Sequence, residues 1–353
     1  MLEFVRQEGE PAMAMGLDLW RRAGTGCAVL GLSCVLLAGS AWADNTIRIL
    51  CPTWSGYAPV FVAQDKGYFK ALGIDVNIKF EDERPNVMAA MDRKDIEMDM
   101  RTVGEYQGKP RDAKTPGVII GTIDQSLGAD GVIASGDITS VEQLKGKVVA
   151  SEPNIPGRLL LQMELKKKGL TLGDMQVKQI STGDTVAVFT DPSVAAVVSY
   201  EPYMSQAIDK AAQRKPKVLL SSATYPGIIV DVIIVRQDDL KANPDKYKKF
   251  MIGILKAIEY FKTNKADFIK TAAPHYNLSA DEFAASIEGS LEYTDLKQTA
   301  GSLGKPGAPG TLYKVFDEVM VLNLENGAAD NNLKSAEHID SSILGSITEA
   351  DLK

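Results

Sequence analysis

The sequence predicts an α/β protein made of two sandwich lobes joined by two crossing strands. A strand–loop–helix–strand unit spans residues 47–80, with Pro59 at the first helical position, and this order is typical of parallel sheets. The alternation of strands and helices starts again after residue 135, as a second sheet requires. From Asn243 onward the pattern becomes helical, and we expect this part to pack on the first lobe.

The first lobe is predicted from four apolar runs and two intervening helices. Gly67 suits the end of the first helix, because glycine tolerates the left-handed conformation found there. A second helix is expected over 86–92. The predicted strands are residues 47–51, 72–80, 96–100 and 117–123.

The second lobe is predicted from a capping box at Ser140, followed by strands at 147–151, 177–180 and 194–199 with helices from Pro156, Asp184 and Pro202. Residues 128–134 and 228–235 are β-branched or apolar and are expected to cross between the lobes. The first lobe therefore comprises 44–133 together with 236–353, and the second lobe comprises 134–235.

The C-terminal part contains apolar residues at helical spacing after Asn243-Pro244, and Ser279 is a good cap for a later helix. Residues 301–310 are rich in glycine and proline and are expected to form a loop. A late helix is expected over 315–324.

Residues 16–43 have the pattern of a secretory signal peptide. Arg21-Arg22 supplies positive charge, residues 27–37 form an apolar core too short to span a membrane, and an Ala-x-Ala motif ends at Ala43. We therefore expect cleavage after Ala43 and a periplasmic protein. Residues 1–12 are acidic, unlike the start of a signal, and are interpreted as an extra N-terminus.

The composition limits the classes of partner that we expect for this protein. The net charge is −7, which argues against nucleic acid or an anionic membrane as a partner. Cys51 is the only cysteine after the signal, so we expect no intramolecular disulfide, a buried thiol and a monomer.

Motifs of enzyme chemistry are missing from the sequence. It has no Gly-x-Ser-x-Gly elbow and no phosphate-binding Gly-x-x-x-x-Gly-Lys-[Ser/Thr] loop, and its two histidines, His275 and His338, lie in the helical tail. We therefore predict a protein that is not an enzyme and uses no metal or cofactor.

A binding protein needs aromatic walls and a few polar groups, and the sequence places such residues in loops beside predicted strands or within the crossing strands. The predicted ligand-binding residues are Trp54, Tyr57, Asp82, Thr102, Asp124, Asp130, Asn154, Glu201 and Asp231.

Each of these residues also has a structural interpretation. The aromatic pair can pack between helices, and the polar residues can be caps, turns or helix-entry residues. Arg101, which follows the third strand, can pair with Asp99 or Glu105. Asp130 and Asp231 are harder to explain, because both lie in apolar surroundings and a buried carboxylate is costly unless it is paired. They can share an internal Arg or Lys, or a ligand cation.

The segment from Trp54 to Phe69, Trp-Ser-Gly-Tyr-Ala-Pro followed by Ala-Gln-Asp-Lys-Gly-Tyr-Phe, resembles the opening of a known family. This is the nitrate/sulfonate/taurine group of ABC-importer substrate-binding proteins, also called NMT1/THI5-like or SsuA/TauA-type. The resemblance continues at residues 144–150, 200–203 and 226–231, and covers about 46–270.

The resemblance implies a two-lobed periplasmic-binding-protein fold of type II. It also implies a small-molecule solute held between lobes that close about a hinge, with ABC permease and ATPase subunits as partners. The thiamine-pyrimidine synthases share this fold, but the cysteine-rich run and active-site histidine of those enzymes are missing here.

The ligand is predicted from charge. The expected cleft loops hold five carboxylates against only Arg101 and Arg158, which favours a small nitrogen-containing cation of guanidinium or amine type. The alternatives left open are a zwitterion, a sulfonate, taurine or nitrate anion as in the family, and an enzyme of the thiamine-pyrimidine-synthase kind. The five carboxylates are Asp82, Asp124, Asp130, Glu201 and Asp231.

Overall fold

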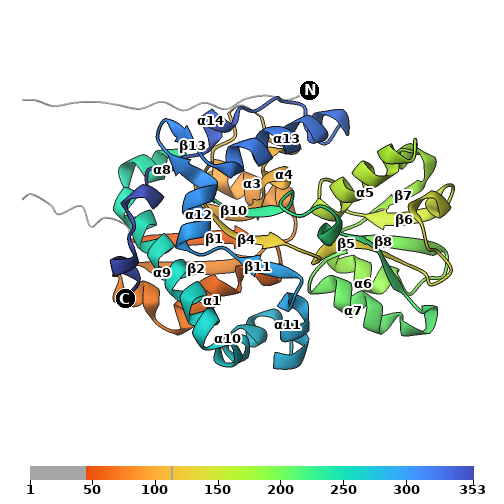
Figure 1. Ribbon diagram of the computed structural model, residues 1–353, viewed down its shortest axis with the longest axis horizontal. Coiled ribbons are helices and arrows are strands. Elements are labelled where there is room, and N and C mark those ends of the chain that lie inside the picture. The colour runs from red at the N-terminus through yellow and green to blue at the C-terminus, as the bar shows by residue number, and fades with distance from the viewer. Residues whose placement is uncertain (1–44, 113) are drawn as a thin grey trace, which may run out of the picture. The chain divides into compact units, whose positions relative to one another are not determined.

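The computed structural model describes residues 45–112 and 114–353, which contain two β-sheets flanked by helices (Figure 1). The predicted signal peptide and its cleavage point lie outside the described residues. Within the described ranges, no helix has both the length and the apolar character that crossing a membrane requires.

The first sheet has six strands in the order β11-β4-β10-β3-β1-β2. The parallel pairing of β1 with β2 confirms the predicted strand–loop–helix–strand unit, while β10 runs antiparallel to β3 and β4. The strand β11 was not predicted, because it has only three residues. The bounds are β1 Thr46–Cys51, β2 Asp75–Phe80, β3 Met98–Thr102, β4 Val118–Ser126, β10 Val230–Val235 and β11 Leu291–Tyr293.

The second sheet has five strands in the order β7-β6-β8-β5-β9. Three of its strands match the predicted ones, but β9 was missed, because it is a half-exposed edge strand flanked by lysines. The bounds are β5 Asp130–Ala134, β6 Val148–Ser151, β7 Gln176–Gln179, β8 Val194–Tyr200 and β9 Lys217–Ser221.

The two segments expected to cross between the lobes do not do so along their whole length, because the strand in each segment belongs to a single sheet. Strand β5 belongs to the five-stranded sheet and β10 to the six-stranded sheet. The chain therefore changes sheets within 127–129 and again within 222–229, a few residues before the expected boundaries at 133/134 and 235/236.

Helices cover both faces of each sheet (Figure 1). In the six-stranded sheet, α1, α9 and α10 lie on one face and α3, α4 and α13 on the other. In the five-stranded sheet, α5 lies opposite α6 and α7. The bounds are α1 Ala58–Asp65, α2 Tyr68–Ala71, α3 Arg84–Asp92, α4 Val103–Gln107, α5 Pro156–Lys167, α6 Thr185–Val188, α7 Tyr203–Lys210, α9 Pro244–Thr263, α10 Lys265–Ala272 and α13 Thr311–Glu325.

The helical C-terminal part packs on the first sheet's helices, as expected. Phe250 of α9 stacks on Phe69 with ring centroids 5.4 Å apart, and a Cβ at Gly253 would lie 2.4 Å from the Phe69 ring. Ser279 caps the helix α11 as predicted. The remaining bounds are α8 Gln237–Ala242, α11 Ala280–Ile287, α12 Leu296–Leu303 and α14 Ser335–His338.

The structure differs from the loop that the sequence predicted over 301–310. The helix α12 extends to Leu303, and two short strands, β12 (Gly304–Lys305) and β13 (Ala308–Pro309), then pair as a hairpin. Gly307 has φ +79° at the turn, so the Pro-Gly sequence that indicated a loop instead closes a hairpin.

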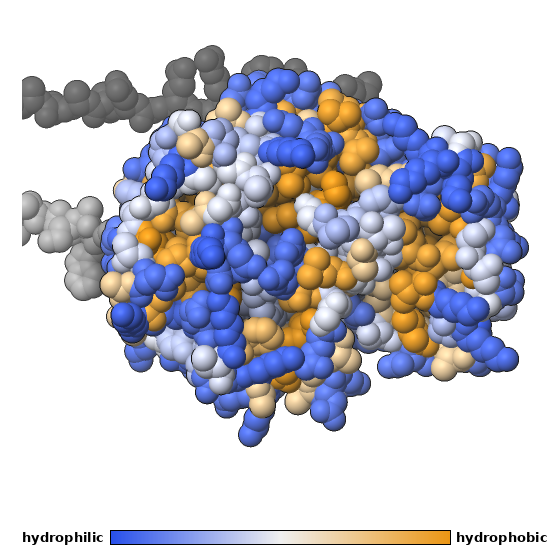
Figure 2. Space-filling view, viewed as in Figure 1, coloured by the Kyte–Doolittle hydropathy of each residue, from blue (hydrophilic) through white to orange (hydrophobic). Residues whose placement is uncertain are grey.

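The surface is mostly hydrophilic over the outer sides of the helices, with apolar residues between them (Figure 2). Val218 and Val321, about half exposed at 49% and 55%, are the exposed large hydrophobic residues of the described chain.

Candidate functional site

The loop after β1 carries Trp54 and the single turn η1 (Ser55–Tyr57), and C-terminal helices together with strand β11 hold it in place. Tyr276 donates to the Trp54 carbonyl at 2.9 Å, and Tyr293 donates to the Ser55 carbonyl at 3.2 Å. The Ser55 and Ser286 hydroxyls are 3.0 Å apart. Each contact joins residues more than 200 positions apart, so the C-terminal part fixes the position of this loop.

Polar residues on adjacent strands form a row across the six-stranded sheet. Asp231 of β10 lies opposite Thr102 of β3 on one side and Asp124 of β4 on the other. Asp124 in turn lies opposite Tyr293 of β11. Directly paired residues in antiparallel strands have Cα atoms about 4.5–5.5 Å apart. The strand register therefore brings two aspartates side by side.

The aromatic loop donates hydrogen bonds to both of these aspartates. The Trp54 indole N–H lies 3.1 Å from Asp124 Oδ2, and the Tyr57 hydroxyl lies 2.6 Å from Asp231 Oδ1. A Cβ at Gly56 would lie 2.1 Å from both Asp124 Oδ2 and the indole nitrogen. Only glycine therefore permits this approach.

The second lobe contributes Asp130, at the start of β5, and Tyr200, opposite it at the end of β8. The ring of Tyr200 meets that of Trp54 edge to face, with centroids 6.0 Å apart. Pro156, the first residue of α5, lies beside them in the same cavity wall. Residues from both sheets therefore face each other here.

These residues line a small, partly open pocket between the sheets, which we call the internal cavity. The volume that the centre of a water-sized sphere can occupy is about 10 Å³, so the cavity has room for about one water molecule. The lining residues are Pro52, Trp54, Tyr57, Thr102, Glu105, Asp130, Pro156, Tyr200 and Asp231.

Three carboxyl groups at this cavity are buried, with Asp124, Asp130 and Asp231 at most 2% exposed. Burial raises the pKa of Asp124 to about 7, against the opposing hydrogen bond from Trp54. Burial also raises the pKa of Asp130 and of Asp231 well above the usual range, and the Asp124 charge adds to both shifts. Asp130 Oδ2 and Asp231 Oδ2 receive no hydrogen bond from a donor of the described chain, although a hydrogen bond between the Asp124 and Asp231 carboxyls, which requires one of them to be protonated, opposes the rise of the Asp124 pKa.

Arg101 has the structural role that the sequence left open. Its guanidinium lies 3.2 Å from Asp99 and 3.5 Å from Glu105, and its side chain is only 2% exposed. Arg101 therefore pairs with Asp99 and Glu105, while its Nη2 has no hydrogen-bond partner in the described chain, and no hydrogen bond there joins Arg101 to Asp130 or Asp231.

Of the nine predicted residues, five line the cavity and Asp124 bonds Trp54 in its wall. Asn154 lines a neighbouring small pocket together with Thr102 and Glu105, and its side-chain amide lies 3.4 Å from the Lys109 carbonyl. The five lining residues are Trp54, Tyr57, Thr102, Asp130 and Asp231.

Asp82 and Glu201 do not line the cavity. Asp82 accepts hydrogen bonds from the Thr53 backbone at 2.7 Å and from the Tyr203 hydroxyl at 3.0 Å, so it joins the loop after β1 to α7 of the second lobe. Glu201 accepts from the backbone and hydroxyl of Ser205, at 3.2 and 2.9 Å. Glu201 therefore has a structural role at the start of α7, which is one of the interpretations that the sequence left open.

Sequence reasoning missed Glu105 and Pro52 as cavity residues. Glu105 was considered only as a partner for Arg101. It also completes a capping box, accepting from the backbone and hydroxyl of Thr102 at 3.1 and 2.8 Å. The Thr-x-x-Glu spacing is the sequence signal that would have placed it beside Thr102.

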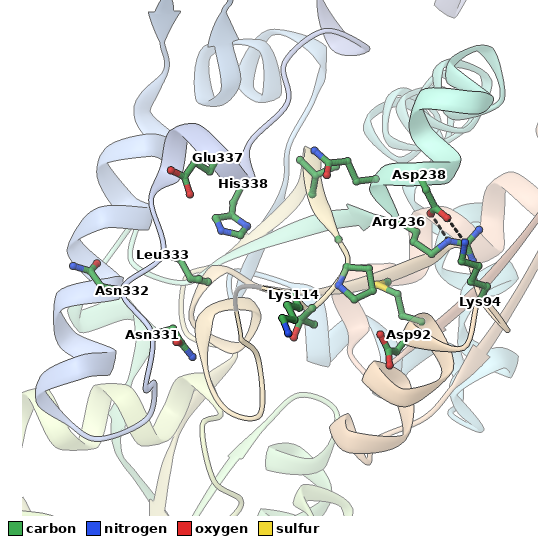
Figure 3. A pocket seen from close by; sticks show the side chains of 16 residues that line it. Asp92, Lys94, Lys114, Arg236, Asp238, Asn331, Asn332, Leu333, Glu337 and His338 are labelled. Carbon is green, nitrogen blue, oxygen red and sulfur yellow. Dashed lines mark hydrogen bonds and ion pairs between the residues drawn. The ribbon is translucent and has the colours of Figure 1, made fainter.

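A much larger hollow lies elsewhere on the first lobe, and we call it the outer hollow (Figure 3). It has about 650 Å³ of space and is open to solvent. Its lining carries charges of both signs, and Asp238 pairs with Lys94 at 2.7 Å and with Arg236 at 2.6 Å. None of the nine predicted site residues lines it.

The fold and the cavity between two α/β lobes define the class of two-lobed periplasmic binding proteins. The alkanesulfonate-binding protein SsuA of Xanthomonas axonopodis pv. citri, bound to MOPS, matches with a TM-score of 0.69 at 15% identity, over 84% of this chain and 99% of that one. The periplasmic nitrate-binding protein NrtA of Synechocystis PCC 6803 matches with a TM-score of 0.63 at 14% identity, over 87% of each chain. These likenesses confirm the predicted fold class.

The family follows from the sequence. Residues 54–266 match the model of the NMT1/THI5-like family, so the chain belongs to that family, as the resemblance indicated. A Brucella abortus (strain 2308) protein described as a binding protein is 24% identical over 310 residues, covering 80% of this chain and 95% of that protein.

Proposed function

We propose that this protein is the periplasmic solute-binding component of an ABC importer and that its solute is a small nitrogen-containing cation of guanidinium or amine type. The observation that carries the proposal is that Asp130 and Asp231 line one cavity and that each has a buried carboxylate oxygen, Oδ2, without a donor in the described chain. A buried carboxylate is stable when a cation pairs with it and donates hydrogen bonds to it.

Most side-chain donors of the cavity lining are already engaged. The donors of Trp54, Tyr57 and Thr102 are directed at carboxylate oxygens of Asp124, Asp231 and Glu105. An oxyanion would depend on the Tyr200 hydroxyl or on a protonated carboxyl for a donor, whereas a cation with N–H groups can bond the open oxygens of both Asp130 and Asp231.

The aromatic walls support the same ligand class. Trp54, Tyr57 and Tyr200 all line the cavity, and aromatic faces attract cations by about 0.5–2 kcal/mol. Guanidinium and amine groups combine this attraction with hydrogen bonding to carboxylates.

The remaining parts of the proposal follow the family and the sequence. The protein is exported with cleavage after Ala43, acts as a monomer and delivers its solute to permease and ATPase subunits of the inner membrane. The lobes, one built on each sheet, close about the ligand by a hinge movement at the segments that join them, within 127–129 and 222–229.

A sulfonate-, taurine- or nitrate-type anion is the second candidate, because the two solved structures described above are named for sulfonate and nitrate binding. The enzyme alternative gains no support from the described residues. Cys51 is fully buried with its thiol pKa raised by burial, and His275 and His338 bond Asp65 and Tyr106 outside the cavity.

A thermal-shift screen of the mature protein tests the proposal. The panel consists of guanidinium at millimolar concentration, methylguanidinium, methylammonium, taurine, an alkanesulfonate, nitrate and an aminopyrimidine. We expect the melting temperature to rise with the guanidinium and ammonium compounds, because a ligand that binds only the folded state stabilises it. Stabilisation by the sulfonates or nitrate alone would overturn the cation proposal.

A further inference from the structure

The internal cavity concentrates acidic groups without a basic one among its lining residues. The groups that act on Asp231 are Asp124 from β4, Tyr57 from η1, Asp130 from β5 and Glu105 from α4. Those that act on Asp130 are Ser126, Glu105, Asp124 and Glu201, and those that act on Asp124 are Trp54 and Asp231. Each titratable group in these sets is a carboxyl or a phenol.

The nearby guanidinium does not change this balance. Arg101 is paired with Asp99 and Glu105, and the Arg101 charge is not among the largest influences on Asp124, Asp130 or Asp231. Transferring an unpaired carboxylate from water to a buried site costs several kcal/mol, and a group in that position usually takes up a proton instead. The three aspartates therefore favour their protonated forms when no cation is beside them.

We propose, building on the proposed function, that ligand binding at this site is an exchange in which a cation with at least two N–H donors bonds Asp130 Oδ2 and Asp231 Oδ2 while a carboxyl proton leaves to the solvent. The balance is one neutral carboxyl plus one cation giving one carboxylate–cation pair plus one proton, which the buffer accepts. No covalent bond between heavy atoms changes.

The requirement for N–H donors follows from the two open oxygens. They belong to different strands, β5 and β10, in different sheets. An amidinium or guanidinium group presents several donors in one plane and can bond both oxygens. A tetramethylammonium ion carries the same charge and can lie against Trp54 and Tyr200, but it leaves both oxygens unpaired. The site should therefore discriminate between these two cations.

The direction of the pH effect follows from the raised pKa values. The pKa of Asp124 lies at about 7, and those of Asp130 and Asp231 are well above the usual range. At pH 5 to 6 the ligand must displace a proton, and this competition weakens as the pH rises. The dissociation constant should fall by up to about tenfold per pH unit for one proton released.

Isothermal titration of methylguanidinium into the mature protein measures this exchange. Titrations at pH 6, 7 and 8 give the dissociation constants, and parallel titrations in phosphate and Tris count the released protons from the difference in heat. Methylguanidinium keeps its charge over this range, so only protein groups contribute. We expect tighter binding at higher pH, release of about one proton, and at least about tenfold weaker binding of tetramethylammonium.

Two results separate failure of the exchange from failure of the proposed function. Methylguanidinium binding with the same dissociation constant at pH 6 and 8, and no difference between buffers, would overturn the exchange and leave the cation proposal intact. No binding of methylguanidinium or methylammonium at any of these pH values would overturn both. Equal binding of tetramethylammonium would overturn the N–H requirement.

Variants test whether the released proton comes from a carboxyl group of the cavity. Asp231→Asn should reduce both the proton release and the pH dependence, whereas Asp75→Asn, an exposed aspartate of β2, should leave both unchanged. If Asp231→Asn does not fold, as circular dichroism would show, the wild-type proton count still decides the proposal.

Discussion

The internal cavity and the outer hollow use charge in opposite ways. In the outer hollow, Lys94 and Arg236 both pair with Asp238, and the Lys94 and Asp238 side chains are 64% and 49% exposed (Figure 3). In the cavity, Asp130 and Asp231 are almost fully buried and each retains an unpartnered oxygen. The outer hollow has about 650 Å³ of space and the cavity about 10 Å³.

The larger hollow has paired charges on its lining, whereas the smaller cavity has buried carboxylate oxygens without a donor in the described chain, so volume alone does not identify a binding site. Exposed ion pairs satisfy each other in water and contribute little, whereas a buried carboxylate needs a proton or a cation. The small cavity therefore has an unmet chemical requirement that the large hollow lacks. The following predictions test that contrast, from the largest expected effect to the smallest.

The largest effect should be the pH dependence of stability without ligand. The pKa of Asp124 is raised to about 7 in the folded state, so its stabilising contribution is complete below the ordinary carboxyl pKa near 4 and is lost as the pH rises to about 7. Each such carboxyl changes the free energy of unfolding by up to about 1.4 kcal/mol per pH unit. Urea unfolding at several pH values measures this slope.

In the outer hollow, the contribution of Asp238 to the free energy of unfolding should change with pH in the opposite direction. Lys94, first, and then Arg236 lower the pKa of Asp238 to about 2, so its contribution is lost only as the pH falls below about 4. Unchanged stability of the wild type between pH 4 and 7, with no difference in Asp231→Asn, would show that the cavity carboxyls are not the source of any pH dependence.

Removing one open carboxylate should weaken cation binding strongly. Asp130→Asn and Asp231→Asn should each cost about 1.5–3 kcal/mol, the range for a hydrogen bond to a charged group, or roughly ten- to a hundredfold in the dissociation constant for methylguanidinium. Asp75→Asn serves as the exposed control. Unchanged affinity in both cavity variants would show that these aspartates are structural.

Gly56→Ala should disturb the aromatic wall. The added Cβ would lie 2.1 Å from the Trp54 indole nitrogen and from Asp124 Oδ2, so these two groups must separate. We expect a loss of about 1–3 kcal/mol in unfolding free energy and a change in Trp54 fluorescence. Gly345→Ala, at a site where an added Cβ meets nothing within 4 Å, is the control. Wild-type stability of Gly56→Ala would contradict this packing.

Tyr203→Phe should weaken closure modestly. The Tyr203 hydroxyl donates to Asp82 across the two lobes at 3.0 Å, and because this contact is only partly buried we expect it to contribute less than a buried bond to a carboxylate, about 0.5–1.5 kcal/mol. The dissociation constant should rise about two- to tenfold. Tyr225→Phe, which removes a hydroxyl bonded to Glu164 on α5, should leave affinity unchanged. Equal effects of the two variants would refute a specific role for the Asp82 contact.

The smallest effect is expected in the outer hollow. Lys94→Met removes an exposed ion pair, and such pairs contribute about 0–1 kcal/mol to stability. Methylguanidinium binding should not change. A loss of binding comparable to that of Asp231→Asn would mean that the two regions are coupled.

Much of the fold could be predicted from the sequence because its signals are local. The apolar run before Trp54, Pro59 at the helix start and Gly67 at its end act over a few residues. Strand β1 and helix α1 form where expected, and β2 begins at Asp75, three residues later than expected, after the unpredicted helix α2. Short or half-exposed strands such as β9 and β11 carry no such pattern. They form because neighbouring strands offer free backbone groups.

The candidate site divides in the same way. That aromatic and acidic residues follow strand ends, and that Asp130 and Asp231 lie in apolar surroundings, can be read from neighbouring residues in the sequence. Their hydrogen-bond partners depend on how distant segments pack. Tyr57 reaches Asp231 across 174 positions and Trp54 reaches Asp124 across 70, through strand register and a loop held by the distant C-terminal part. Hydrogen bonds depend on distances of a few tenths of an ångström, and only the packed chain sets those distances.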